Sequence, residues 1–408
     1  MTTEDPIASM LGALVDGGEL AGASTLVWRG GEVVQTACVG WRDMEARAPI
    51  EPDTIFRIAS MSKPITSTAA LMLLEEGAFA LNDPIARWAP EFASIRVLRT
   101  PDGALDQTGP AAREITFEDL LTHRSGLTYE DFHSGPIARA YAEALGGHID
   151  SDVAPDDWIA ALAALPLIDQ PGAAFHYGRS TDLLGLLIAR IDGAPLGEML
   201  QRRIFGPLGM HDTGFTVPAG KRSRRAAAYG FDPDGRLAVR AAPVGALPER
   251  PQDMAYVSGG QGLWSTTRDY LAFARMFLGA GAVDGVRLLR PETVALMTGN
   301  RLTEAQRANA TMLGMPAFVG HGFGLGVAVV LDPAKAPPTR CRGGIGTVGW
   351  PGAYGGWWQA DPGDGSVLVF LAHSLLDMDQ LSRGVGLGVW SAITRFHALA
   401  ASAGPAGR

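Results

Sequence analysis

The sequence predicts an α+β fold, in which an antiparallel sheet is flanked by helices and carries a mainly helical insertion. Strand patterns form a hairpin near the N-terminus, helical patterns separated by Pro- and Gly-rich loops fill the middle, and strand patterns return toward the C-terminus. This order assigns residues 1–80 and 246–408 to one sheet domain and residues 81–245 to a mainly helical domain. The cleft between them is the expected place for a functional site.

The N-terminal elements follow from periodicity and turn residues. Residues 7–20 form an amphipathic pattern, and residues 23–39 read as two strands joined at RGGE, residues 29–32. Helical spacing covers residues 60–76 and stops at Gly77, a favoured residue just past a helix end. Pro64 then falls in the first helical turn, where its missing N–H costs little, so Ser60 lies at the N-terminal end of this helix.

The remaining elements are predicted in the same way. A capping box at Thr116 and Asp119 opens one helix. Further helices are expected at residues 155–165, 183–191, 267–278 and 387–401. Strands are expected at residues 323–331, 346–360 and 367–373, the last two separated by the turn residues DPGDG.

Composition excludes several classes of function. The chain has 408 residues, 47% of them hydrophobic, and a net charge of −9 without any long basic stretch, which argues against nucleic acid or a membrane surface as partner. The start lacks the features of a secretory signal and no apolar run is long enough to span a membrane, so a cytoplasmic location is expected. Cys38 and Cys341 are expected to be buried free thiols, and no cofactor or metal is expected because no metal-ligand spacing occurs.

The chemistry centres on a serine and a lysine one helical turn apart. Lysine is scarce in this chain, and Ser60 and Lys63 stand at i and i+3 on one helix face, within hydrogen-bond reach. A desolvated lysine can release its proton, whereas an arginine cannot. Free N–H groups at the helix start stabilise negative charge near Ser60. The pattern alone is weak, because chance produces it in many chains.

Two further segments carry candidate residues. Tyr177 lies in an extended stretch, FHYGRS, just before a predicted helix, where it can point into a cleft. Trp350, Pro351 and Gly352 lie in a Gly-rich strand. Proline predicts that this strand is at a sheet edge, and glycine allows a ligand to approach the backbone.

Five motifs in order resemble the serine β-lactamase and penicillin-binding-protein superfamily, specifically its class C-like branch and the family VIII carboxylesterases. They are FRIASMSKP at 56–64, LLTHRSGL at 120–127, PLGM at 207–210, GGQGL at 259–263 and WPG at 350–352. The resemblance covers nearly the whole chain and implies the β-lactamase/transpeptidase-like form of the predicted fold.

The resemblance also implies roles for individual residues. Ser60 would attack the acyl carbon, and Tyr177 together with Lys63 would take its proton and later deliver it to the leaving group. The positive charge of Lys63 would favour the ionised form of Tyr177. The backbone N–H groups of Ser60 and Ala353 would form the oxyanion hole.

Departures from the family pattern narrow the substrate. β-Lactamases and D-peptidases carry Lys or His followed by Thr-Gly where this chain has Trp350, Pro351 and Gly352, so the carboxylate-binding cation and hydroxyl are missing. Trp350 and Gly352 are therefore expected to bind an uncharged substrate. Arg179 stands where many relatives have asparagine, and it is expected either to meet an acidic substrate or to pair with a structural carboxylate.

The expected function is hydrolysis of short-chain carboxylic esters through an acyl-enzyme on Ser60, with a small-molecule ester as the substrate. An acyltransferase using the same acyl-enzyme, or a β-lactamase or small-amide hydrolase, remains an alternative within enzymes. A catalytically silent scaffold relative is the alternative outside enzymes. The sequence fixes neither the physiological ester nor the oligomeric state.

Overall fold

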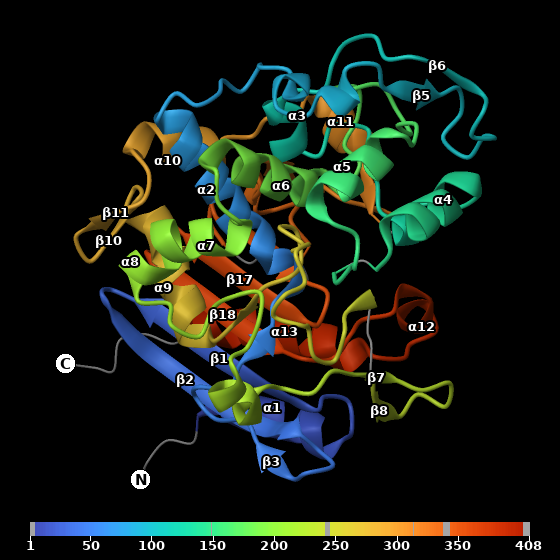
Figure 1. Cartoon of the computed structure of the whole chain (residues 1–408). Helices are drawn as coiled ribbons and strands as arrows, with labels where there is room; N and C mark the ends of the chain where they lie inside the picture. Colours follow the sequence, from blue (N-terminus) through green and yellow to red (C-terminus); the bar gives the residue numbers. More distant parts are fainter. Residues whose placement is uncertain (1–4, 148, 241–244, 313, 338–342, 403–408) are drawn as a thin grey trace.

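The computed structural model describes residues 5–147, 149–240, 245–312, 314–337 and 343–402. In these residues an eight-stranded sheet has the order β14-β15-β16-β17-β18-β1-β2-β3, with every neighbouring pair antiparallel. Its strands are β1 (Gly22–Arg29), β2 (Glu32–Asp43), β3 (Ala48–Pro49), β14 (His321–Phe323), β15 (Ala328–Val330), β16 (Val348–Gly352), β17 (Gly356–Asp361) and β18 (Ser366–Ala372). Strands from the two ends of the chain meet where β1 pairs with β18, which confirms the predicted α+β arrangement (Figure 1).

Glycines set the turns of the sheet. The predicted hairpin is confirmed: β1 and β2 are joined at Gly30 and Gly31, whose φ angles of 62° and 95° belong to the left-handed region that glycine adopts without strain. Two strand predictions are wrong because each overlooked a turn. Residues 346–360 form two strands that turn back near Gly355 (φ 80°), and residues 323–331 belong to β14 and β15, which turn back near Gly326 (φ 91°).

Helices cover both faces of the sheet. Helices α1 (Pro6–Asp16) and α13 (Leu387–Ser402) share one apolar cluster with Leu368 and Phe370 of β18, while Val369 of β18 belongs to the larger cluster on the opposite face. On that opposite face lies α9 (Thr267–Leu278), at its predicted position. All seven residues of β18 are therefore buried, since neither face of this strand meets water.

The middle of the chain is mainly helical, as predicted. Helix α2 (Ser62–Glu75) packs against α6 (Ser180–Asp192) at the centre of the molecule, as Figure 1 shows. Helix α3 (Phe117–Leu121) opens with the predicted capping box, in which Thr116 Oγ1 accepts from the Asp119 N–H and the Asp119 carboxylate accepts from the Thr116 N–H. The other α-helices are α4 (Pro136–Leu145), α5 (Pro155–Ala163), α7 (Leu196–Leu200), α8 (Gly206–Leu208), α10 (Pro291–Thr298), α11 (Glu304–Asn309) and α12 (Met378–Ser382).

Short two-stranded sheets connect these helices. They pair β4 (Phe56–Arg57) with β9 (Trp264–Ser265), β5 (Arg96–Leu98) with β6 (Thr108–Pro110), β7 (Tyr229–Phe231) with β8 (Leu237–Val239), β10 (Ala282–Val283) with β11 (Val286–Arg287), and β12 (Thr311–Met312) with β13 (Met315–Pro316). The eight-stranded sheet takes no strand from residues 81–245 among those described. The division into two domains at residues 80 and 245 stays a prediction.

The structure can be compared with the sequence expectations about membrane spans and about the two cysteines. Within the described ranges, no helix is long and apolar enough to cross a membrane. Cys38 is a free thiol, but it is half-buried rather than buried, because β2 lies near the open edge of the sheet. Cys341 lies outside the described residues.

Candidate active site

The nucleophile candidate lies on a tight turn between a strand and a helix. Strand β4 ends at Arg57, and a 3₁₀ turn at Ala59–Met61 leads into α2. Ala59 has a φ of 43°, a left-handed conformation that costs a non-glycine residue about 1–3 kcal/mol and is concentrated at functional sites. Ser60 lies close to the N-terminal end of this helix, as predicted, but in the 3₁₀ turn, since α2 itself begins at Ser62 rather than at Ser60; its side chain is buried.

Lys63 is the centre of the site. Its side chain is buried, and its Nζ donates to Ser60 Oγ at 3.2 Å, which confirms the predicted contact between the two residues. The same Nζ donates to Tyr129 OH at 3.2 Å and to the Gly260 carbonyl at 3.0 Å. An ammonium group has three N–H donors, and here each has an acceptor. The position of Lys63 is thus fixed by three parts of the chain.

Tyr177 contacts Lys63 through its ring. Lys63 Nζ lies 4.6 Å from the centre of the Tyr177 ring, a cation–π contact. The Tyr177 hydroxyl accepts from Trp350 Nε1 at 3.1 Å, and no hydrogen bond joins Tyr177 to Ser60 or Lys63, all of which the structure describes. The Tyr177 oxygen is thus held by the Trp350 indole while its ring lies against the Lys63 amine.

Tyr129 is a site residue that the sequence analysis missed. Its hydroxyl donates to Asp182 Oδ2 at 3.3 Å while it accepts from Lys63. Burial, and then the negative charge of Asp182, raise the pKa of Tyr129 well above its usual value, so this phenol keeps its proton. Tyr129 follows the LLTHRSGL motif by two residues, and its place close to that motif was the available signal.

The two predicted oxyanion-hole donors are free of other partners. In the part of the chain that the structure describes, neither the Ser60 N–H nor the Ala353 N–H donates to a protein acceptor. A Cβ on Gly352 would lie only 2.6 Å from the Ile58 carbonyl oxygen, so glycine is needed for the end of β16 to approach the turn that carries Ser60. The oxyanion hole itself stays a prediction.

The strand that carries Gly352 differs from the prediction. It is not an edge strand, because β16 lies between β15 and β17. Strand β15, however, pairs only with Val348 and Gly349, so residues 350–352 pair on one side only, with β17. Pro351 is accommodated there because its missing N–H faces no neighbouring strand.

Two predicted substrate-binding side chains are instead buried. Arg179 has no exposed surface, donates to Glu130 Oε1 at 2.8 Å and lies 3.9 Å from Asp182 Oδ2. The expectation that it meets a substrate is therefore wrong, and its partner is a structural carboxylate. Trp350 is 1% exposed and packs against Tyr177, so its described contact is with this tyrosine rather than with an open cleft.

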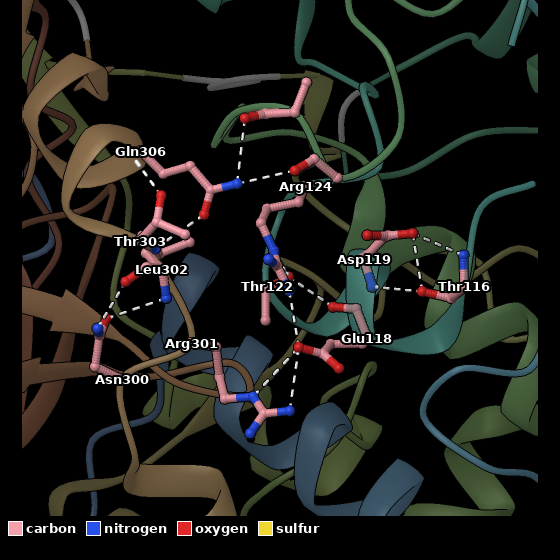
Figure 2. A network of polar contacts seen from close by, with 12 residues as sticks. Thr116, Glu118, Asp119, Thr122, Arg124, Asn300, Arg301, Leu302, Thr303 and Gln306 are labelled. Carbon is pink, nitrogen blue, oxygen red and sulfur yellow. Dashed lines mark hydrogen bonds and ion pairs between the residues drawn. The ribbon is translucent and has the colours of Figure 1, made fainter. Parts of the chain in front are cut away.

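The segment before Tyr177 is held by a polar network. The Gln306 side-chain amide donates to the carbonyl oxygens of Gly172 and Ala173 at 2.8 and 3.2 Å. Figure 2 shows Glu118 of α3 between Arg124 and Arg301, which joins the start of the α11 segment to the helical part of the chain. These contacts link residues that are far apart in the sequence and limit the motion of the segment that leads to Tyr177.

The arrangement is suited to acyl transfer. A nearly buried hydroxyl bonded to a lysine amine is a form of activated nucleophile, and two free N–H groups at the turn can stabilise an oxyanion. His123 is an unsuitable base, because burial and then the charge of Lys63 hold its pKa well below the usual value. Lys63 and Tyr177 therefore remain as the candidates for the general base that takes the Ser60 proton.

Comparisons with known proteins agree with this chemistry. A sequence family described as Beta-lactamase matches residues 7–384. Protein Rv1367c of Mycobacterium tuberculosis is 48% identical over 89% of this chain and 88% of its own, and Esterase EstB of Burkholderia gladioli is 32% identical over 87% and 86%. A solved structure described as "EstCE1, a hydrolase with promiscuous acyltransferase activity" has a TM-score of 0.77 and 26% identity, covering 95% of this chain and 97% of its own.

Proposed function

Because the chain belongs to the beta-lactamase family, in its esterase-like branch, we propose that it hydrolyses short-chain carboxylic esters through an acyl-enzyme on Ser60. Membership of this branch makes it a serine hydrolase or acyltransferase. The observation that carries the proposal is the 3.2 Å hydrogen bond from Lys63 Nζ to Ser60 Oγ in a buried site. A catalytically silent relative would have no need to keep this contact intact.

The proposed reaction begins with attack by Ser60 Oγ on the ester carbonyl carbon. The Ser60 proton passes to Tyr177, whose ring lies against Lys63 Nζ and whose oxygen accepts from the Trp350 N–H. The carbonyl oxygen becomes an oxyanion that the N–H groups of Ser60 and Ala353 bind. Collapse breaks the ester C–O bond, and the alcohol leaves with the proton returned by Tyr177. Water then attacks the acyl carbon in the same way and releases the acid and Ser60.

The end of β16 supports an uncharged substrate. Trp350, Pro351 and Gly352 offer neither a cation nor a hydroxyl where a β-lactam carboxylate would need one. The guanidinium of Arg179, a cation that could meet an acidic group, is buried against Glu130. Esterase EstB and the hydrolase EstCE1, both similar to this chain, are named for ester or hydrolase chemistry, which supports the same choice.

Acyl transfer to an alcohol is the second candidate function. EstCE1 is described as having promiscuous acyltransferase activity, and transfer needs only that an alcohol replace water on the same acyl-enzyme. Hydrolysis with an added alcohol present would divide the acyl group between acid and new ester. Chromatographic measurement of both products separates the two activities.

The proposed function is tested with a substrate panel. We expect kcat/KM for p-nitrophenyl acetate or butyrate to exceed that for nitrocefin by at least about 100-fold, roughly 3 kcal/mol of transition-state stabilisation. Ser60→Ala should lower ester turnover by about 1000-fold or more while the protein stays folded. Equal turnover of nitrocefin would contradict the substrate assignment, and an active Ser60→Ala variant would contradict the mechanism.

A further inference from the structure

The carboxylate of Asp182 connects two of the three groups that hold Lys63. Asp182 lies in the first turn of α6, three residues after Arg179, and has no exposed surface. Its Oδ1 accepts from the Gly260 backbone N–H at 3.0 Å and from the Ser258 hydroxyl, and its Oδ2 accepts from Tyr129 OH at 3.3 Å. Among the described residues, no hydrogen bond or ion pair joins Asp182 directly to Lys63 or Ser60.

Both linked groups are acceptors for the Lys63 ammonium. Lys63 Nζ donates to Tyr129 OH at 3.2 Å and to the Gly260 carbonyl at 3.0 Å, and its remaining bond is the one to Ser60 Oγ. One carboxylate therefore orients the Tyr129 phenol and holds the backbone of Gly260 through its N–H, and the phenol oxygen and the Gly260 carbonyl in turn hold the amine that faces the nucleophile. Four segments of the chain take part in this arrangement, and they are widely separated in the sequence: residues 60–63, 129, 182 and 258–260.

The groups around Asp182 are closely packed, so a change at this position is transmitted to its neighbours. A Cβ on Gly260 would lie 3.0 Å from Asp182 Oδ1 and 3.1 Å from Tyr129 OH. A Cβ on Gly259 would lie 3.0 Å from the Thr181 carbonyl oxygen, so the 258–262 segment lies directly against α6. A group at position 182 that repels Tyr129 OH or the Gly260 N–H would displace the acceptors of Lys63.

We propose that Asp182 is a positioning residue for the acylation step: it holds Tyr129 and Gly260 so that Lys63 Nζ stays on Ser60 Oγ. The inference rests on the proposed function, since it concerns how readily Ser60 reacts. Because Asp182 touches no substrate, its loss should lower kcat and leave KM nearly unchanged. A displacement of about 1 Å at a catalytic group costs on the order of 100-fold in rate.

The test uses Asp182→Asn, which conserves shape but presents an N–H₂ donor to Tyr129 OH or to the Gly260 N–H. The rate at which a fluorophosphonate modifies Ser60 measures how reactive the serine is, whatever the natural substrate. Hydrolysis of p-nitrophenyl acetate supplies kcat and KM. We expect both the labelling rate and kcat to fall by about 10-fold to 100-fold, with KM changed by less than about twofold.

Asp192→Asn is the matched control. Asp192 is a nearly buried carboxylate at the other end of α6, and it pairs with Arg202 and Arg203 away from the site. Its substitution should lower stability by a comparable mechanism and leave labelling and kcat within about twofold. An Asp182→Asn protein that is folded and labels at the wild-type rate would overturn the positioning role.

A double-mutant cycle tests the route through Tyr129. If Asp182 acts partly by holding Tyr129, Asp182→Asn should lower the labelling rate by a smaller factor in a Tyr129→Phe background than in the wild type. If the two substitutions lower the labelling rate by independent factors that simply multiply, this route is overturned.

If Asp182→Asn does not fold, Ser258→Ala is the alternative variant, because it removes one hydrogen bond to the Asp182 carboxylate. We expect labelling to slow by about threefold to tenfold. An unchanged rate there would overturn the proposal.

The outcome for the wild type keeps the two proposals distinct. A wild-type protein that is not labelled on Ser60 and hydrolyses no ester would overturn the proposed function, and the positioning role with it. A labelled and active wild type beside an unaffected Asp182→Asn variant would overturn only the role of Asp182.

Discussion

A single hydrogen bond links the indole of Trp350 to the candidate base. Trp350 Nε1 donates to Tyr177 OH at 3.1 Å, and the Tyr177 ring lies next to Lys63 Nζ. The sequence predicts that Trp350 binds an uncharged substrate, whereas in the structure its indole N–H donates to Tyr177, the tyrosine proposed to carry the proton. In this position an indole does what no aliphatic residue could do, because it fills the space and supplies a donor.

Trp350→Phe should expose this role. Phenylalanine keeps an aromatic ring in the cluster but removes the N–H, so the Tyr177 oxygen loses the hydrogen bond that holds it in place. We expect kcat/KM for p-nitrophenyl acetate to fall by about 10-fold, which corresponds to roughly 1.4 kcal/mol. Steady-state kinetics at fixed pH measure the change.

Trp357→Phe provides the comparison for that variant. Trp357 stands opposite Pro351 on β17, and its Nε1 donates to Gln359 Oε1 at 3.2 Å rather than to a site residue. Its loss should leave kcat/KM within about twofold. Equal effects of the two substitutions would mean that Trp350 matters only for packing.

At the residue scale the sequence could predict contacts within one helical turn but not those between distant segments. Ser60 and Lys63 are three residues apart, so helix geometry alone brought them together. Tyr129 is 66 residues from Lys63, and nothing in the local pattern indicates that they meet. The sequence left two partners open for Arg179 for the same reason, because its pairing depends on Glu130, which is 49 residues away.

The element scale shows where local patterns succeed. Helix α9 was predicted with its observed ends, since Thr266 caps it and Gly279 follows it. The strands near the site were predicted less well, because apolar residues and glycines continue through the turns near Gly326 and Gly355 and hide them. Whether β16 lies at an edge depends on how far β15 extends beside it, which is a property of the sheet and not of the strand.

Gln306 has two roles on α11 that separate substitutions can distinguish. As the third residue of the helix, its side chain completes a capping box with Thr303, and its amide also donates to the carbonyls of Gly172 and Ala173. Gln306→Glu keeps an acceptor for the capping box but no longer donates to those carbonyls. Gln306→Ala loses both.

We expect Gln306→Ala to lower the free energy of unfolding by about 1–2 kcal/mol and Gln306→Glu by at least about 1 kcal/mol. Both should lower kcat modestly, because the segment that leads to Tyr177 becomes less constrained. Urea unfolding and ester kinetics give the two quantities. A Gln306→Glu protein as stable and active as the wild type would show that the bonds to residues 172 and 173 do not restrain the segment.

At the scale of the whole molecule, a buried histidine makes stability depend on pH. His373 directly follows β18 and lies between the rings of Phe56 and Tyr229. Burial lowers its pKa from 6.5 to about 4. Between these values the unfolded chain binds a proton that the folded chain does not, so the stability is complete above about pH 6.5 and declines as the pH falls toward 4.

His373→Asn removes this titration. Over the interval from pH 7 to pH 4, the wild type should lose on the order of 3 kcal/mol more than the variant, since each pKa unit corresponds to about 1.4 kcal/mol. Urea unfolding at a series of pH values measures the difference. His211→Asn, which alters an exposed histidine, should keep the wild-type slope. Parallel curves for His373→Asn and the wild type would contradict the assignment.

The pairing of β1 with β18 has a consequence for how this protein is made. Ala23 lies opposite Ala372, so strands about 350 residues apart become neighbours. A ribosome adds about 5–20 residues per second, and the N-terminal hairpin therefore waits roughly 20–70 seconds for its partner, with the backbone N–H and C=O groups of β1 open on one side. The central sheet closes only after β18 has left the ribosome, and a nascent chain stalled before residue 366 offers that open strand to any other β-strand nearby.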